Sequence, residues 1–171
     1  MPTKQKYIFT LGFEKLTMVE FIRMVKDQDI ARVVDIRSEN TVMEGRGRFS
    51  PEQLADILKN VNVDYIRLPE AGIPLELQSV PKSNGHFTDF CREYTKLISS
   101  NKKLLKRINE LFPDGNALIL SFEANVNVSH RLPFSEIVLS VLGKSYKLRH
   151  LDYKDLKPIE IPPQEPPERS K

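Results

Sequence analysis

The sequence predicts an α/β fold in which helices cover a sheet of five strands. Two observations carry this prediction. Short apolar runs typical of buried strands alternate along the chain with segments whose apolar residues recur at helical spacing. The 171 residues, 40% hydrophobic and 29% charged, suit one globular domain with a single core and exclude a disordered chain or a small disulfide scaffold.

The first half of the chain is predicted to form three strands and two helices. The strands are expected at residues 7–11, 32–36 and 63–68. The first helix begins with Thr17-Met18-Val19-Glu20, a capping-box pattern, and runs to about residue 28. The second begins after Ser50, because this capping residue precedes a proline at the first helical position. Residues 37–49 and 69–85 are polar or rich in turn formers and are expected to be long loops.

The second half is predicted to contain three further helices and two strands. Apolar residues at helical spacing predict two helices around 87–97 and 104–111, which Ser99-Ser100-Asn101 separates as a break and cap. A buried strand at 117–122, a helix from Pro133 to Gly143 and a strand at 145–151 follow.

Alternation of strands and helices predicts a mostly parallel, Rossmann-like sheet with helices on both faces, because right-handed crossovers place successive strands parallel. The expected strand order is 3-2-1-4-5. Residues 1–157 are expected to form a single domain. Residues 158–171 contain five prolines in fourteen residues, which predicts an extended or disordered tail.

Composition narrows the class of protein. A net charge of +3 is too small to imply nucleic-acid binding by itself. No apolar run approaches the roughly 20 residues that span a bilayer, so no membrane association is expected. The single cysteine, Cys91, cannot form an internal disulfide, and the N-terminus carries no cleavage signature. A cytoplasmic location is therefore expected.

Several short motifs, taken in order, resemble those of a known family. They are Phe9-Thr10-Leu11-Gly12-Phe13, Val34-Asp35-Ile36-Arg37-Ser38, Phe49-Ser50, Tyr65-Ile66-Arg67-Leu68-Pro69-Glu70-Ala71-Gly72, and Glu123 with His130-Arg131. Their order and spacing over residues 7–151 resemble the YeaO-like domain of unknown function family, DUF488. The resemblance implies an α/β fold and carries no established activity.

The chain departs from that family's pattern at two serines. Family members that it resembles usually carry cysteine at the position of Ser121 and a Cys-His-Arg triplet where this chain has Ser129-His130-Arg131. A thiolate can attack carbon or bind a soft metal, whereas an unactivated hydroxyl does neither well. The resemblance therefore implies that any cysteine chemistry of the family has been lost here.

The strongest site prediction is the rim at the carboxyl ends of the strands. In a doubly wound sheet the loops after these ends surround the ligand position. The candidate ligand-binding residues that the motifs place there are Gly12, Arg37, Glu70, Glu123, Ser129, His130 and Arg131. Arginine beside the start of a helix favours an anion, so the predicted ligand is an anionic small molecule, phosphate or nucleotide-like.

Two structural alternatives remain open for these residues. Arg37, Glu123 and Arg131 can form an ion-pair network that only holds loops over the rim. Asp35 and Arg37, two positions apart on a strand, can simply pair with each other. A packed, hydrogen-bonded role for His130 is an equally valid interpretation.

Catalysis is a separate hypothesis, for which the candidates are His130, Glu123 and Ser121. A serine-based hydrolase or transferase would use Ser121 or Ser129 with His130, although no nucleophile-elbow motif is present. No cofactor and no metal are predicted, because His130 and Glu123 are only two plausible ligands and His86 and His150 fall in distant segments.

A basic loop supports an alternative of another class. Arg46 and Arg48 within Gly45-Arg46-Gly47-Arg48 could contact phosphate or nucleic acid, and the proline-rich tail could bind a protein module. The chain would then be a non-enzymatic interaction domain. Ordinary solvated arginines and a plain tail are the competing interpretation.

Overall fold

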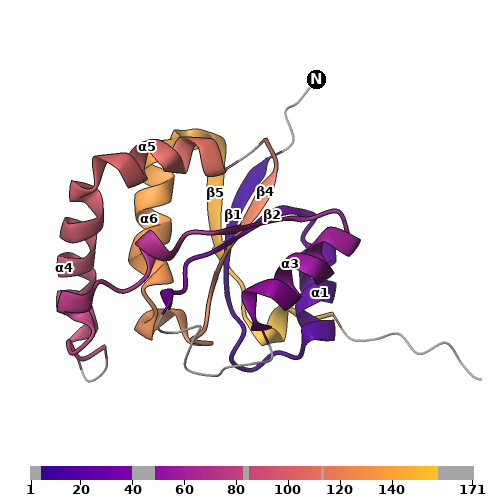
Figure 1. Ribbon diagram of the computed structural model, residues 1–171, viewed down its shortest axis with the longest axis horizontal. Helices are drawn as coiled ribbons and strands as arrows, with labels where there is room; N and C mark the ends of the chain where they lie inside the picture. Colours follow the sequence, from indigo (N-terminus) through magenta and orange to yellow (C-terminus); the bar gives the residue numbers. More distant parts are fainter. Residues whose placement is uncertain (1–4, 40–48, 83–84, 113, 158–171) are drawn as a thin grey trace, which may run out of the picture.

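A computed structural model describes residues 5–39, 49–82, 85–112 and 114–157. They form one five-stranded sheet in which every pairing is parallel. Figure 1 shows the sheet with helices on either side of it. The strands are β1 (Lys6–Gly12), β2 (Ile30–Asp35), β3 (Asp64–Arg67), β4 (Asn116–Ser121) and β5 (Tyr146–His150). The predicted α/β, Rossmann-like class is confirmed.

The predicted strand order is wrong in one respect. The order is β3-β2-β4-β1-β5 instead of 3-2-1-4-5, so β4 lies between β2 and β1. Both strands suit the central position, because residues 8–11 of β1 and 117–120 of β4 are at most 3% exposed, and it is the pairing of β2 with β4 that places β4 there. Both orders place β1 beside β4, so the loops that follow these two strands still meet at the carboxyl rim of the sheet.

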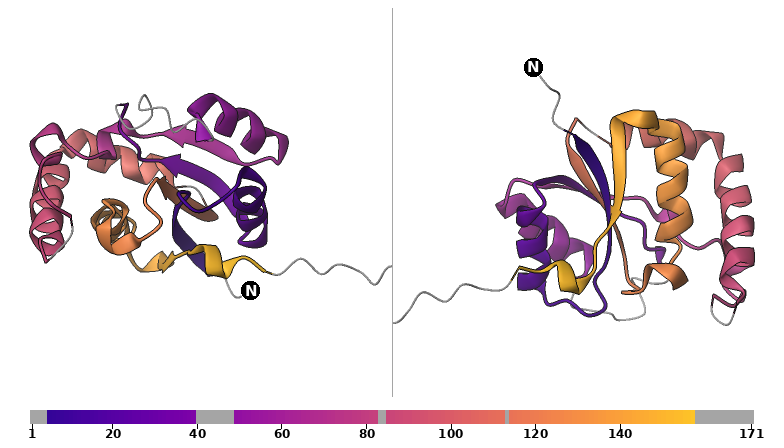
Figure 2. Two further views of the ribbon diagram at one scale, coloured as in Figure 1. Left: turned by 90° about the horizontal axis from the view of Figure 1, so that it is seen from below. Right: turned by 180° about the vertical axis from the view of Figure 1, so that it is seen from behind.

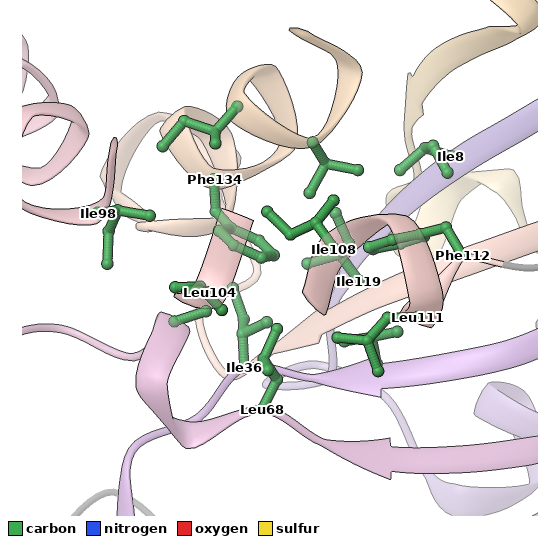
Figure 3. Close-up of a cluster of buried hydrophobic side chains, with 14 of the residues drawn as sticks. Ile8, Ile36, Leu68, Ile98, Leu104, Ile108, Leu111, Phe112, Ile119 and Phe134 are labelled. Atoms are coloured by element: carbon green, nitrogen blue, oxygen red, sulfur yellow. The ribbon is translucent and has the colours of Figure 1, made fainter. Parts of the chain in front are cut away.

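Helices cover both faces of the sheet, as the two views in Figure 2 show. One face carries α1 (Met18–Asp27) and α3 (Pro51–Asn60). The other carries α4 (Phe87–Ser100), α5 (Lys102–Leu111) and α6 (Arg131–Leu142). Strand residues alternate between the two cores because successive side chains point to opposite faces. Figure 3 shows the second core, where Phe134 of α6 packs over Ile119 of β4.

Capping residues begin α1, α3 and α5 where the sequence predicts. The last helix begins at Arg131, two residues before the predicted Pro133, and has no side-chain cap. The Thr17 hydroxyl accepts from the Glu20 N–H at 3.3 Å, and the Glu20 carboxylate accepts from the Thr17 N–H at 2.7 Å. Ser50 caps α3 and Asn101 caps α5 through their side-chain oxygens. Gly143 ends α6 with a φ of 74°, a left-handed conformation that favours glycine.

The predicted loop after β3 contains two short 3-10 turns, Pro69–Ala71 and Leu75–Leu77. The Tyr94 hydroxyl of α4 donates to the Ala71 carbonyl and fixes this segment against the helix layer. The basic loop with Arg46 and Arg48, and the tail at 158–171, lie outside the described residues. Within the part of the chain that the structure covers, no helix combines the length and apolar character needed to cross a membrane.

Candidate functional site

At the carboxyl end of β4, the loops that follow β1 and β4 lead to opposite faces of the sheet. The chain leaves β1 toward α1 on one face and leaves β4 toward α6 on the other (Figure 1). Adjacent parallel strands whose connections part in this way open a crevice between their carboxyl ends. Residues 122–130 connect β4 to α6 and carry the predicted site residues Glu123, Ser129 and His130.

Gly12 closes the rim on the β1 side. It lies opposite Ser121 in the parallel register. A Cβ atom at this position would approach the Glu123 carbonyl oxygen to 1.7 Å and the Arg131 Nη1 to 2.9 Å. Only a residue without a side chain fits here. Because Gly12 has no Cβ atom, the loop after β4 and the Arg131 guanidinium can approach β1.

Arg131 is a buried guanidinium at the start of α6, with 1% of its surface exposed. Its Nη2 donates to the Ala124 carbonyl at 2.9 Å, and its Nη1 donates to the Ser121 hydroxyl at 3.1 Å and to the Glu123 carbonyl. Its buried Nε has no hydrogen-bond partner among the described atoms. Burial lowers the pKa of Arg131 to about 10, although Glu123 and Asp152 oppose this shift. The group therefore stays charged at neutral pH.

Two serines connect Arg131 to a carboxylate. The Ser129 hydroxyl lies 3.1 Å from the Ser121 hydroxyl and donates to Glu123 Oε2 at 3.1 Å. Because an ionised carboxylate only accepts hydrogen bonds, the Ser129 hydroxyl donates to Glu123, and the Ser121 hydroxyl donates to Ser129. The donors thus run in one direction, from Arg131 through both serines to Glu123. Both hydroxyls are fully buried.

Glu123 is the last acceptor in this series of hydrogen bonds, and its side chain is partly exposed. Its Oε1 pairs with Lys82 Nζ at 3.2 Å, and about a quarter of each side chain is exposed. Burial raises the pKa of Glu123, but His130, Lys82 and local hydrogen bonds outweigh it, so the net pKa lies below the ordinary value. The carboxylate is ionised at neutral pH.

His130 lies on the β2 side of the rim. Its Nε2 donates to the Ile36 carbonyl at 3.1 Å, which leaves Nδ1 as a lone-pair acceptor. That Nδ1 is buried without a partner among the described atoms. Burial lowers the pKa of His130, against the raising effects of Glu123 and the Ile36 carbonyl, so the ring is neutral at pH 7. The serine hydroxyls bond to each other, Glu123 and Arg131, and not to this ring.

Arg37 pairs with Asp35, the last residue of the strand that precedes it. Its Nη2 pairs with Asp35 Oδ2 at 2.6 Å, its Nε donates to Oδ1 at 2.9 Å, and both side chains are at most 2% exposed. The Tyr65 hydroxyl also donates to Asp35 at 2.7 Å, and the Phe13 ring lies 4.9 Å from the guanidinium carbon. The simple-pairing alternative is thus what the structure contains, and it anchors the end of β2.

Glu70 is engaged away from the rim cluster. Its half-exposed carboxylate binds Arg107 Nη1 of α5 at 2.8 Å. The structure therefore brings together Gly12, Ser121, Glu123, Ser129, His130 and Arg131, and it places Arg37 and Glu70 in separate ion pairs.

The first turn of α6 offers few free N–H groups. The Leu132 N–H donates to the Ser129 carbonyl at 3.1 Å, and the Arg131 N–H lies 3.4 Å from the Ser129 hydroxyl. Pro133 has no N–H to offer. An anion at this end would therefore be bound by side chains more than by the helix terminus.

A cleft of about 410 Å³ opens on the β1–β5 side of Arg131. Its walls are Lys15, residues 124–127, Arg131 and residues 150–152. Sequence reasoning missed four charged or titratable members of the rim, namely Lys15, Lys82, His150 and Asp152. Lys82 lies in the segment 69–85, which the sequence predicts to be a long loop. Lys15 follows β1 on its connection to α1. His150 and Asp152 carry no local signal, because only the pairing of β5 with β1 brings them to Arg131.

Side chains that could hold a metal ion are sparse in this structure. Across residues 5–39, 49–82, 85–112 and 114–157, no three His, Cys, Asp or Glu side chains gather into a possible metal site. The chemistry that the arrangement offers is that of one buried guanidinium, one exposed ammonium and polar hydrogens around a cleft.

Fold and rim together define a parallel α/β domain with a cleft at the carboxyl ends of its strands. The profile of the family described as Domain of unknown function DUF488 matches residues 17–138. The chain belongs to this family, as the motif resemblance predicted. Neither the curated proteins nor the solved structures gave a match. Replacement of family cysteines by Ser121 and Ser129 stays a prediction.

Proposed function

We propose that this domain binds an anionic small molecule, phosphate or nucleotide-like, in the cleft beside Arg131. The observation that carries the proposal is the guanidinium itself: it is almost fully buried, lines the cleft, and donates its hydrogen bonds only to neutral oxygens. Burying such a charge is costly unless it is paired. An anion in the cleft would supply the pairing.

The surroundings of Arg131 have the composition of an anion site. Lys15 adds an exposed ammonium, and residues 125 and 127 are asparagines whose amides can donate. Asp152 is the one acidic residue in the lining. On the other side of Arg131, Glu123 is already shared with Lys82 and Ser129, which limits how far it can neutralise the guanidinium.

The proposal concerns binding and assigns no reaction. The hydroxyls of Ser121 and Ser129 are committed to a chain that ends on Glu123, and the His130 ring is committed to the Ile36 carbonyl. Each of these groups has a hydrogen-bond partner within the protein, and the Ser121 hydroxyl also accepts from the Arg131 guanidinium at the edge of the cleft.

Thermal-shift measurements with inorganic phosphate, nucleotides and carboxylate metabolites test the proposal. Arg131→Ala would leave two buried carbonyls without donors and could unfold, so the informative variant is Lys15→Glu at an exposed position. Phosphates are expected to raise the melting midpoint of the natural chain and not that of Lys15→Glu.

Lys106→Glu is the matched control, because Lys106 is an exposed lysine on α5 away from the cleft. It should respond to phosphate like the natural chain. A midpoint that no anion raises, or an equal rise in Lys15→Glu, would overturn the proposal.

A further inference from the structure

A histidine shares the cleft with Arg131 and has an unusual partner. His150, at the end of β5, lines the cleft and is half-buried. Its Nδ1 lies 2.7 Å from the hydroxyl of Thr10, the residue opposite it on β1, and Thr10 is fully buried. The ring is thereby fixed by a group that belongs to the neighbouring strand.

The Thr10 hydroxyl can form a hydrogen bond with the His150 ring in either of its charge states. It donates to Nδ1 when the imidazole is neutral and accepts from Nδ1–H when the ring is protonated. In both states Nε2 keeps its hydrogen and can donate to an acceptor. His150 can therefore gain or lose a proton without turning, which is the property of a titrating ligand contact.

We propose that the cleft takes a dianionic phosphate-type group and that His150 takes up a proton when this group binds. The inference rests on the proposed function and adds the charge class of the ligand and the residue that responds to it.

The charges around the cleft support a dianion. Lys15 and Arg131 contribute two positive charges and Asp152 one negative charge, so the lining has a net charge of about +1 while His150 is neutral. Glu14 is turned to the Ala124 N–H at 2.9 Å, and its residue is not part of the lining. Arg149, the neighbour of His150, pairs with Asp155. Protonation of His150 raises the net charge of the lining to about +2, which a dianion matches.

The free protein holds His150 in its neutral form. Burial first, and then the charge of Arg131, lower the pKa of this ring below its ordinary value. A dianion beside the ring would counter the effect of Arg131 and raise the pKa. Proton uptake therefore accompanies binding, and the affinity increases as the pH falls through the interval between the free and the bound pKa.

Calorimetric titration with inorganic sulfate and inorganic phosphate tests this inference. Sulfate stays a dianion throughout, so any change of its affinity between about pH 8 and about pH 6 reports on the protein. We expect sulfate to bind more tightly at the lower pH, by at most about tenfold per pH unit for one coupled proton. Phosphate titrated at neutral pH in two buffers of different ionisation enthalpy should show net proton uptake.

Variants separate His150 from the other histidines. His150→Gln should still bind sulfate but lose the pH dependence and the proton uptake. Thr10→Val keeps the shape of the side chain and removes the hydroxyl, so it should weaken the coupling without abolishing the cleft. His86→Gln, at an exposed position before α4, should behave as the natural chain does.

The possible outcomes are distinct. Binding of sulfate with the same affinity at both pH values, or an unchanged pH dependence in His150→Gln, would overturn this inference and leave the proposed function standing. Acetate that binds as tightly as sulfate would overturn the dianion class. No binding of any anion would remove the proposed function as well.

Discussion

Among single residues, Gly12 has the tightest surroundings at the rim. Its role differs from that of a turn glycine, because the constraint is contact with the Glu123 carbonyl and not a positive φ. We expect Gly12→Ala to destabilise the protein by roughly 1–3 kcal/mol or more, since the backbone of the β4 loop must move. Urea denaturation measures this. Gly115→Ala is the control, because its Cβ would meet only the Ala31 methyl group at 3.3 Å; an equal loss in both variants would contradict the account.

The pair of Asp35 and Arg37 gives a second prediction. Asp35→Asn removes the charge that faces a guanidinium with 2% exposure, so we expect a loss of about 3–5 kcal/mol in the free energy of unfolding. Asp64→Asn removes the partner of Arg32 at a largely exposed position and should cost less than about 1 kcal/mol. Chemical denaturation of both variants provides the comparison, and similar losses would show that Arg37 does not depend on its partner.

His130 gives a prediction about pH. Its folded pKa lies below the unfolded value of about 6.5, so the unfolded chain binds a proton that the folded one excludes. Stability should therefore be level above about pH 6.5 and fall as the pH drops toward the folded pKa. Unfolding measured down to about pH 5 keeps clear of the carboxylates.

Replacing His130 isolates its share of that slope. His150 also has a lowered pKa and acts in the same direction, so His130→Gln should reduce the slope and not abolish it. His86→Gln should leave the slope as it is in the natural chain. A full slope in His130→Gln would mean that burial of this ring does not govern the acid response.

The sequence could predict the site residues that follow one another along the chain. Glu123, Ser129, His130 and Arg131 stand within nine positions after a buried strand, and they do lie together. His150 was placed in a distant segment because nothing local shows that β5 pairs with β1. Arg37 illustrates the opposite case: its position at the rim was predictable, but its engagement by Asp35 depends on side-chain geometry.

At the scale of elements, the capped helix starts, those of α1, α3 and α5, were the most predictable features. Side-chain caps act within three or four residues, so the sequence contains the whole interaction. We expect Thr17→Ala to lower stability by about 1 kcal/mol through loss of the capping box of α1. Thr88→Ala, at an exposed position inside α4, should change stability by less than about 0.5 kcal/mol. Thermal unfolding distinguishes the two, and equal effects would argue against the cap.

The order of strands could not be obtained in the same way. Orders 3-2-1-4-5 and 3-2-4-1-5 contain the same elements and both satisfy right-handed crossovers. Burial does not separate the two orders, because residues 8–11 of β1 and 117–120 of β4 are equally well covered. The order is set by the pairing of β2 with β4, a tertiary contact that no local pattern indicates. The consequence for the site is specific: β2 borders β4, so the Ile36 carbonyl can receive the His130 imidazole.

For the whole molecule, the sheet separates two cores and leaves its carboxyl rim as the place where both sets of connections meet. The family whose profile matches residues 17–138 has no known function, so the function of the rim has to be inferred from the residues that form it. That chemistry is a buried guanidinium held by two backbone carbonyls and the Ser121 hydroxyl, beside a cleft that a second cation and a histidine border.

Chemical-shift mapping by NMR with inorganic phosphate tests the central claim most directly. If phosphate binds in the cleft beside Arg131, we expect saturable shifts of the backbone amides of Lys15, residues 124–127 and residues 150–152. A second cleft of about 370 Å³ between Lys6, Asp29 and Asp114, at the amino ends of the strands, serves as the internal control and should stay unperturbed. Shifts centred on that second cleft, or none at the carboxyl rim, would contradict the anion site.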